Sequence, residues 1–363
     1  MNKLLNIHQN INMKKNFLKY FIPIIILSII GIVSIYSSQS IVPNFYDFLK
    51  KQIIFIIIGV VLLFLFKKIN YNLIEKYCFL FYLFTIFLLV YVLFFGSVIN
   101  GSRSWINLFG ITIQPSEFAK ISLLLCLDKY IYTKYGFIKS IILVLVPSIL
   151  TFLQPDTGTV IFYLVIYVSI FLSMGLKKKY YIGLFSLVGV VIVSYFYLYF
   201  FQSELFINIF GTSFFYRTDR IINFMNSEGF QINNALIGIG NGGFFGNGVK
   251  YVIYIPEAIT DFMFANILTM FGFVGGVITI LLFLYIDREL VRDIFNLKKH
   301  KFFVIGLFGL FFYQQVQHIF MDIGLLPITG ITLPFVSYGG SSLISYYILF
   351  GILLNLKKYH IDT

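Results

Sequence analysis

Tyr77-Cys-Phe-Leu-Phe-Tyr-Leu-Phe-Thr-Ile-Phe-Leu-Leu-Val-Tyr-Val-Leu-Phe-Phe-Gly96 is an uninterrupted stretch of chain without a charged side chain. A helix needs about 20 consecutive, mostly apolar residues to cross the hydrocarbon layer of a bilayer. The rest of the chain agrees with this stretch, because 59% of the 363 residues are hydrophobic and 12% are charged. Soluble domains carry about 25% charged residues. The composition therefore argues against a soluble enzyme, a disordered chain or a fibrous repeat, and predicts an integral membrane protein.

Apolar stretches of this kind recur along the whole sequence and predict an all-α bundle of ten transmembrane helices in a single domain, residues 1–363. The first stretch has no cleavage site after it, so we expect it to remain as a signal anchor. A large outer loop at 202–261 separates the seventh and eighth predicted helices. The ten predicted spans are 17–37, 52–66, 77–96, 117–133, 138–153, 159–175, 180–201, 262–286, 302–320 and 339–356.

Lysine and arginine are distributed unevenly over the two sides of this predicted topology. With the N-terminus in the cytoplasm, 20 of the 27 basic residues fall on the cytoplasmic side and six fall outside. This excess follows the positive-inside rule when both termini are cytoplasmic. The net charge of +12 is then explained by orientation in the membrane, and we expect no nucleic-acid partner.

The predicted outer segments differ from the short basic loops inside. Residues 102–114 contain Arg103 and Trp105, the only tryptophan of the chain, and the loop 202–261 contains Arg217 and Arg220. Long loops in compact folds are usually functional or disordered, and frequent aromatic residues predict that this one packs on the bundle. Its glycine cluster, Gly238 to Gly248, either makes tight turns at an interface or binds a pyrophosphate through backbone amides.

Four ionisable residues near predicted span ends are candidate site residues. Glu117 and Lys120 share a helix face, as a buried ion pair or as groups lining a wet cavity. Asp156 either closes a turn or belongs to a site. Asp261 lies where the long loop meets the eighth span and suits a general base, although it could instead cap that helix. We expect His318 to be a packing residue.

Four segments together resemble the SEDS family (shape, elongation, division and sporulation), the RodA, FtsW and SpoVE proteins. The resemblance covers the chain from its first third to its C-terminus, in the family's order. The matching segments are Arg103-Ser-Trp-Ile106 through Gln114-Pro-Ser-Glu-Phe-Ala-Lys120, Gln154-Pro-Asp-Thr-Gly-Thr159, Pro256-Glu-Ala-Ile-Thr-Asp-Phe262, and Gly324-Leu-Leu-Pro-Ile-Thr-Gly330 with Leu333-Pro-Phe-Val-Ser-Tyr-Gly-Gly-Ser-Ser342.

The resemblance implies a glycosyltransferase that polymerises lipid II, a disaccharide-pentapeptide on undecaprenyl pyrophosphate, at the outer face of the bacterial cytoplasmic membrane. It makes Asp261 the essential carboxylate and implies a divalent cation, Mg²⁺ or Mn²⁺, as a helper. An apolar groove between spans would hold the polyprenyl tail. The implied partners are a class B penicillin-binding protein and other cell-wall synthesis machinery. The residues it implies for substrate binding are Arg103, Trp105, Glu117, Lys120, Asp156, Arg217, Arg220, Ser337 and Ser341.

Several positions depart from the family pattern and leave alternatives open. Ile259 stands where the family has His, His318 stands where it has Asn, and Asp322 is atypical. A lipid II flippase would predict paired cavities and internal repeats, and the two halves of the sequence show no convincing repeat. A catalytically weak scaffold that recruits a penicillin-binding protein is the other alternative. The sequence does not distinguish a role in elongation, division or sporulation.

Overall fold

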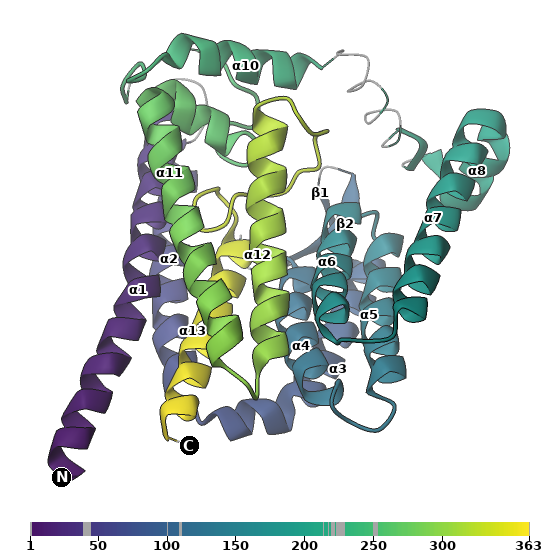
Figure 1. The fold of residues 1–363 in the computed structure, drawn as a ribbon. Coiled ribbons are helices and arrows are strands. Elements are labelled where there is room, and N and C mark those ends of the chain that lie inside the picture. The colour runs from purple at the N-terminus through teal and green to yellow at the C-terminus, as the bar shows by residue number, and fades with distance from the viewer. Residues whose placement is uncertain are drawn as a thin grey trace.

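The structure is a computed structural model, and it describes residues 2–38, 45–99, 101–108, 111–212, 214–216, 218, 222, 229–249 and 253–362. A helix occupies each of the ten segments predicted as spans (Figure 1). Their bounds are α1 (Asn2–Ser37), α2 (Phe45–Lys68), α3 (Tyr71–Phe95), α4 (Pro115–Tyr130), α5 (Gly136–Leu153), α6 (Thr157–Ser173), α7 (Lys178–Phe201), α11 (Met263–Asn296), α12 (Lys301–Asp322) and α13 (Gly340–Asp362).

Eight of these helices are long and apolar enough to cross a membrane, within the part of the chain that the structure describes. The protein is therefore a multi-pass membrane protein. The helix α6 is apolar but has only 17 residues. The helix α4 has 16 residues and carries Glu117, Lys120 and Asp128, yet all three side chains are buried. Because α4 lies inside the bundle, its polar side chains face protein rather than lipid.

The C-terminal helix α13 forms the centre of the packing. Close approach to α2 requires glycine, since a Cβ at Gly59 would lie 2.3 Å from the Tyr347 ring and one at Gly351 would lie 2.8 Å from the Leu63 carbonyl oxygen. Asn355 Nδ2 donates to the Phe66 carbonyl at 2.7 Å and so ties α13 to the end of α2. These contacts hold the C-terminal signature, which immediately precedes and begins α13, against the rest of the bundle.

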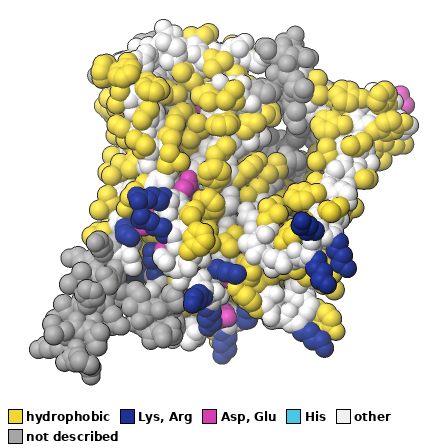
Figure 2. All heavy atoms as spheres, in the orientation of Figure 1, with side chains coloured by type: hydrophobic (Ala, Val, Ile, Leu, Met, Phe, Trp, Pro, Cys, Tyr) yellow, Lys and Arg dark blue, Asp and Glu magenta, His cyan; other side chains and the backbone are white. Residues whose placement is uncertain are grey.

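Basic side chains gather at the end of the bundle where both termini lie (Figures 1 and 2). The helix α11 extends ten residues beyond the predicted end at 286, because its acidic residues there are paired inside the protein. Glu289 binds Lys19 at 3.1 Å, and Asp293 binds Lys357 at 2.8 Å. From the sequence alone, the charged residues after 286 were assigned to a loop.

A small three-stranded antiparallel sheet, which the sequence did not predict, accompanies the helical bundle. It consists of β1 (Ser97–Ile99), β2 (Ser102–Leu108) and β3 (Ile111–Ile113), in that order. Gly101, with φ of 75°, occupies the turn between β1 and β2. The Asn100-Gly101 pair between Val-Ile and Trp-Ile sequences is a typical hairpin signal. Ser102 Oγ donates to the Gln154 carbonyl at 2.7 Å, which attaches the sheet to the turn between α5 and α6.

The segment 202–261 contains helices α8 (Ser203–Phe210) and α10 (Phe230–Gly242). The helix α10 lies across the end of the bundle opposite the termini, against α11 and α12 (Figure 1). The helix α7 stands apart from the bundle beside α8, and Tyr199 is its one buried residue. Packing of α10 agrees with the expectation that this segment lies on the bundle.

The glycine cluster packs against a break in α11. Gly272 has φ of 65° and interrupts the helix, which frees backbone groups on both sides of it. Asn247 N donates to the Thr269 carbonyl at 3.0 Å, and Gly248 N donates to the Met270 carbonyl at 3.0 Å. A Cβ at Gly246 would lie 2.1 Å from the Met270 carbonyl oxygen. The glycines thus make turns at an interface, and these amides are already used there rather than free for a pyrophosphate.

Candidate functional site

Asp261 lies in a tight turn that precedes α11 and is fastened to the C-terminal signature. The amides of Thr260 and Phe262 each donate to the Glu257 carbonyl at 3.1 Å. Ser337 Oγ donates to the Thr260 carbonyl at 2.8 Å. The amide of Tyr338 donates to the carbonyl of the turn's preceding residue, 259, at 2.8 Å. Two segments far apart in sequence therefore form one rigid unit around Asp261.

The Asp261 carboxylate is only partly exposed, and burial is the main cause that raises its pKa to about 6. The negative charge of Glu257 raises this pKa further. Asp261 does not cap α11, because Phe262 occupies the N-cap position and makes no side-chain cap bond. Instead, Asp322 Oδ2 accepts from the Ala265 amide at 2.8 Å. The Asp261 carboxylate is thus available for chemistry near neutral pH.

Glu117 and Lys120 form a buried ion pair, with Lys120 Nζ 2.6 Å from Glu117 Oε2. Ser345 Oγ donates to the same carboxylate oxygen at 3.0 Å. The Lys120 ammonium also lies 4.6 Å from the centre of the Phe162 ring and 5.5 Å from that of Tyr346. An ammonium has three hydrogens to donate, and Glu117 is its one ionic partner among the described residues. The pair is therefore structural, with unused donor capacity.

Asp156 caps α6 and connects it to the start of α4. It accepts from the Thr159 amide at 3.3 Å and from Thr159 Oγ1 at 2.7 Å. Gln114 Nε2 donates to Asp156 Oδ2 at 2.7 Å, and the Gln114 amide donates to Ser341 Oγ at 2.9 Å. Burial raises the pKa of Asp156, and the bonds from Thr159 oppose this rise. The predicted turn-closing role is confirmed for Asp156, which also joins a wider network.

The loop before α13 links these groups to the Asp261 turn. Gln314 Nε2 donates to the Thr332 carbonyl at 2.7 Å, and Thr332 Oγ1 donates to Ser342 Oγ at 3.2 Å. Sequence reasoning did not select Gln314, Thr332 or Ser345. The signal was present in Gln314, Gln315 and Gln317, because polar residues within a predicted span are costly unless they serve a site or a buried contact.

The remaining predicted site residues lie apart or cannot be placed. Arg103 is exposed and Trp105 is half-buried, both on β2. Among the described residues, no hydrogen bond or ion pair joins either side chain to the network around Asp261. Arg217 and Arg220 lie outside the described residues. Within the described ranges, no group of three or more His, Cys, Asp or Glu side chains could hold a metal.

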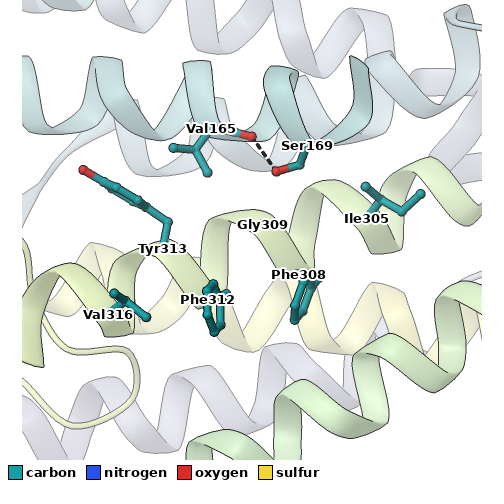
Figure 3. Close-up of a pocket in the computed structure, with 8 residues that line it drawn as sticks. All are labelled: Val165, Ser169, Ile305, Phe308, Gly309, Phe312, Tyr313 and Val316. Atoms are coloured by element: carbon teal, nitrogen blue, oxygen red, sulfur yellow. Dashed lines mark hydrogen bonds between the residues drawn. The ribbon is translucent and has the colours of Figure 1, made fainter. Parts of the chain in front are cut away.

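An apolar groove of about 410 Å³ runs between α6 and α12 (Figure 3). A glycine at 309 is needed there, since a Cβ would lie 2.0 Å from Ser169 Oγ. Tyr313 in the groove packs edge-on against Phe162 at 6.2 Å, and Phe162 carries the Lys120 ammonium on its face. The Phe162 ring therefore lies between Tyr313 of the groove and the buried Lys120 ammonium. Its lining residues are Val165, Ser169, Ile305, Phe308, Gly309, Phe312, Tyr313 and Val316.

The arrangement of these motifs matches that of a known family. The sequence pattern of the family described as Cell cycle protein, which comprises FtsW, RodA and SpoVE, matches residues 17–361. The chain belongs to this family. It is 32% identical to the stage V sporulation protein E of Bacillus subtilis over 92% of this chain and 95% of that protein. It is also 32% identical to the probable peptidoglycan glycosyltransferase FtsW of Haemophilus influenzae, over 92% and 88%.

The fold is shared with a solved member of a peptidoglycan synthase complex that coordinates polymerization and crosslinking. The two structures superpose with a TM-score of 0.76 and 24% identity, over 93% of this chain and 97% of the other. In this FtsW, RodA and SpoVE family member, α11 begins and α12 ends at the end of the bundle opposite the termini (Figure 1). Asp261, just before α11, and Asp322, at the end of α12, therefore both lie there.

Proposed function

We propose that this protein is a peptidoglycan glycosyltransferase that polymerises lipid II at the outer face of the bacterial cytoplasmic membrane. Relatives that share about a third of its residues over most of their length are named for this activity. The observation that carries the proposal is Asp261, a partly buried carboxylate with a raised pKa and no capping role. It is held rigidly beside the C-terminal signature by Ser337 and Tyr338.

We also propose ten spans, cytoplasmic termini and an outer position for the segment 202–261. The support is the gathering of Lys and Arg at the end of the bundle where the termini lie (Figure 2), in the sense of the positive-inside rule. In this orientation Asp261 faces the outside, where the sugar and peptide of lipid II are exposed. The helices α4 and α6 are the remaining two of the ten proposed spans, although the surrounding helices separate α4 from lipid.

The proposed reaction joins the sugar of one lipid II to the growing glycan. Asp261 accepts the proton of the attacking sugar hydroxyl, whose oxygen bonds to the anomeric carbon of the donor while the bond from that carbon to the pyrophosphate oxygen breaks. The departing pyrophosphate needs cationic stabilisation. Arg103 on β2 is exposed and able to reach a ligand, and Arg217 and Arg220 are further candidates from the sequence. Lys120 was a further candidate from the sequence, but its ammonium is fully buried and paired with Glu117.

Ser337 and Ser341 act in this proposal through the loops that they hold. Ser337 Oγ bonds both the Thr260 carbonyl and the Leu333 amide, and Ser341 Oγ accepts from the Gln114 amide. Both hydroxyl groups therefore already form hydrogen bonds with backbone groups. We therefore expect both serines to position the Asp261 turn and the α4 start rather than to touch lipid II.

A divalent cation, Mg²⁺ or Mn²⁺, fits this site as a helper bound largely by substrate. Magnesium is commonly held by one or two protein carboxylates together with substrate phosphates. Glu257 is exposed and interacts electrostatically with Asp261, so it is the described carboxylate that would hold the ion. When bound, the ion would neutralise negative charge on the leaving pyrophosphate.

The groove between α6 and α12 is proposed to hold part of the undecaprenyl tail. Filling it through Val316→Trp should raise the KM for long-tailed lipid II about tenfold and leave kcat nearly unchanged, because only binding of the tail is impaired. Steady-state kinetics with long-tailed and short-tailed substrates would measure this. Ile149→Trp, on the exposed face of α5, is the matched control and should have no effect. Equal losses for both tail lengths would contradict the assignment.

Activity should rise with pH through a midpoint near 6. The raised pKa of Asp261, about 6, means that the carboxylate is protonated below this pH and cannot accept a proton. Above this pH it is ionised and can act as the base. Initial rates between pH 4.5 and 8 would reveal this acid limb. A limb near pH 4 would indicate a solvated carboxylate and contradict the partly buried site.

Reconstitution separates the proposed enzyme from its alternatives. The full chain in vesicles would receive labelled lipid II and Mg²⁺ or Mn²⁺, with and without a class B penicillin-binding protein, the proposed partner. Glycan chains seen on gels would support the polymerase. Transbilayer movement of lipid II without polymer would favour a flippase. No polymer in any arm, with stable binding of the partner, would favour a scaffold. The role in elongation, division or sporulation depends on which partner stimulates the protein.

A further inference from the structure

We propose that His318 and Asp322 form a buried dyad that positions Asp261 by holding both sides of its site. The pair departs from the usual family residues, and sequence reasoning treated His318 as a packing residue. Both side chains are 0% exposed. They are four residues apart on the last turns of α12, so they share one helix face. The part of its test that measures reaction rates rests on the proposed function. The part that measures chemical modification of Asp261 does not.

Asp322 holds the segment that follows Asp261. Its Oδ2 accepts from the Ala265 amide at 2.8 Å, in the first turn of α11. A helix N-terminus has unpaired amides that need an acceptor, and no side chain of the N-cap residue Phe262 supplies one. Asp322 therefore fixes where α11 starts, and with it the orientation of the Asp261 turn. The two carboxylates are also close enough to interact electrostatically.

His318 holds the segment on the other side of Asp261. Its Nδ1 lies 2.7 Å from the Ile331 carbonyl oxygen. Ile331 follows Gly330, where an added Cβ would lie 3.7 Å from Asp261 Oδ2. Gly330 has φ of 69°, a backbone conformation that a side chain would strain. His318 thus keeps the Gly330 backbone against the Asp261 carboxylate.

The two side chains also face each other. The Ile331 carbonyl can only accept, so Nδ1 of His318 must carry a hydrogen. The opposite nitrogen, Nε2, lies 3.5 Å from Asp322 Oδ2, and it forms no hydrogen bond with any of the described residues. At this distance the contact between Nε2 and Oδ2 is electrostatic rather than a hydrogen bond. An Asn at 322 should keep the cap on α11, because its side-chain oxygen can take the place of Oδ2 and accept from the Ala265 amide.

The test compares Asp322→Ala with Asp322→Asn in the full chain. We expect Asp322→Ala to lower kcat at least tenfold with little change in KM, and Asp322→Asn to stay within about threefold of the wild type. Loss of positioning should admit water, so the pKa of Asp261 should fall from about 6 towards about 4 in Asp322→Ala. The pH dependence of carbodiimide modification of Asp261, read by mass spectrometry, measures this shift without any turnover.

The chain offers a matched control at the opposite end of α12. Asp128 Oδ1 accepts from the Phe303 amide at 3.1 Å, and Asp128 Oδ2 lies 2.7 Å from His300 Nδ1. Asp128→Ala removes the same kind of cap and should lower the melting temperature without moving the titration of Asp261. An equal shift in Asp128→Ala would overturn the proposal, because the effect would then be a general loss of stability.

Two further outcomes would also overturn it. One is an Asp322→Ala variant with wild-type kcat and Asp261 titration, and the other is an Asp322→Asn variant as impaired as Asp322→Ala. If Asp322→Ala does not fold, His318→Phe keeps a ring in place and should shift the Asp261 titration in the same direction. If the wild type makes no glycan, the proposed function fails, while carbodiimide modification still decides whether the dyad positions Asp261.

Discussion

Replacing Asp261 with Asn should reduce lipid II polymerisation by about 10²–10⁴-fold, the range that a general base contributes. Asn has nearly the same size as Asp but cannot accept the proton of the attacking hydroxyl. Neither Asp261 nor its replacement caps α11, so the melting temperature should change little. Glycan chain formation by purified protein, with labelled lipid II, measures the loss. The KM should stay within a few-fold of the wild type, since Asn leaves the turn intact.

Glu257→Gln, at saturating divalent cation, is the comparison for this prediction. Glu257 belongs to the same turn and contributes to the raised pKa of Asp261, but it is exposed and accepts a bond from Thr260 Oγ1 at 2.9 Å. Removing its charge should lower the midpoint of the acid limb. Because Glu257 would also help to hold the divalent cation, more Mg²⁺ or Mn²⁺ should be needed, and at saturating cation a substantial rate should remain at pH 7. An Asp261→Asn variant as active as Glu257→Gln would rule out Asp261 as the base.

Breaking the Glu117–Lys120 pair should have the largest effect on stability. Lys120→Met leaves the Glu117 carboxylate buried without its cation, which typically costs about 3–5 kcal/mol. Lys120 Nζ is fully buried and Glu117 nearly so, so water cannot replace the lost partner. Denaturant or thermal unfolding in detergent would measure the loss. Polymerisation should fall as well, because less of the protein stays folded.

The double variant Glu117→Gln with Lys120→Met should regain much of this stability, since no uncompensated charge is left in the bundle. Lys19→Met is the matched control, because Lys19 is 30% exposed and its partner Glu289 also pairs with Arg292. Because Arg292 remains beside Glu289 and water reaches Lys19, Lys19→Met should cost only about 1 kcal/mol. Equal destabilisation by Lys120→Met and Lys19→Met would show that Glu117 finds another partner or water.

The positions of the helices followed from the apolar runs, but their ends did not. Helix α11 continues to Asn296 because Glu289 and Asp293 bind Lys19 and Lys357 from other helices. These partners are 270 and 64 residues away in the sequence, so no local pattern reveals them. The small sheet before α4 was missed because its strands are short, although Asn100-Gly101 is a hairpin signal.

Much of the candidate site was visible as unusual residues in an apolar chain. Glu117, Lys120, Asp156 and Asp261 were selected because an ionisable group near a bilayer is costly without a purpose. Whether each one caps, pairs or reacts depended on neighbours brought close by folding. Asp156 caps α6, while Asp322, rather than Asp261, caps α11.

The sequence by itself determined that this is a membrane protein of the FtsW, RodA and SpoVE family, because the need to bury apolar surface in lipid and the family motifs are both local in the chain. Only the tertiary structure decided which polar groups share one network. The hydrogen bonds from Ser337 to Thr260 and from His318 to Ile331 join loops and helix ends whose backbone groups must find partners once they are removed from water. Among the described carboxylates selected from the sequence, Glu117, Asp156 and Asp261, folding leaves Asp261 without a hydrogen bond or an ion pair.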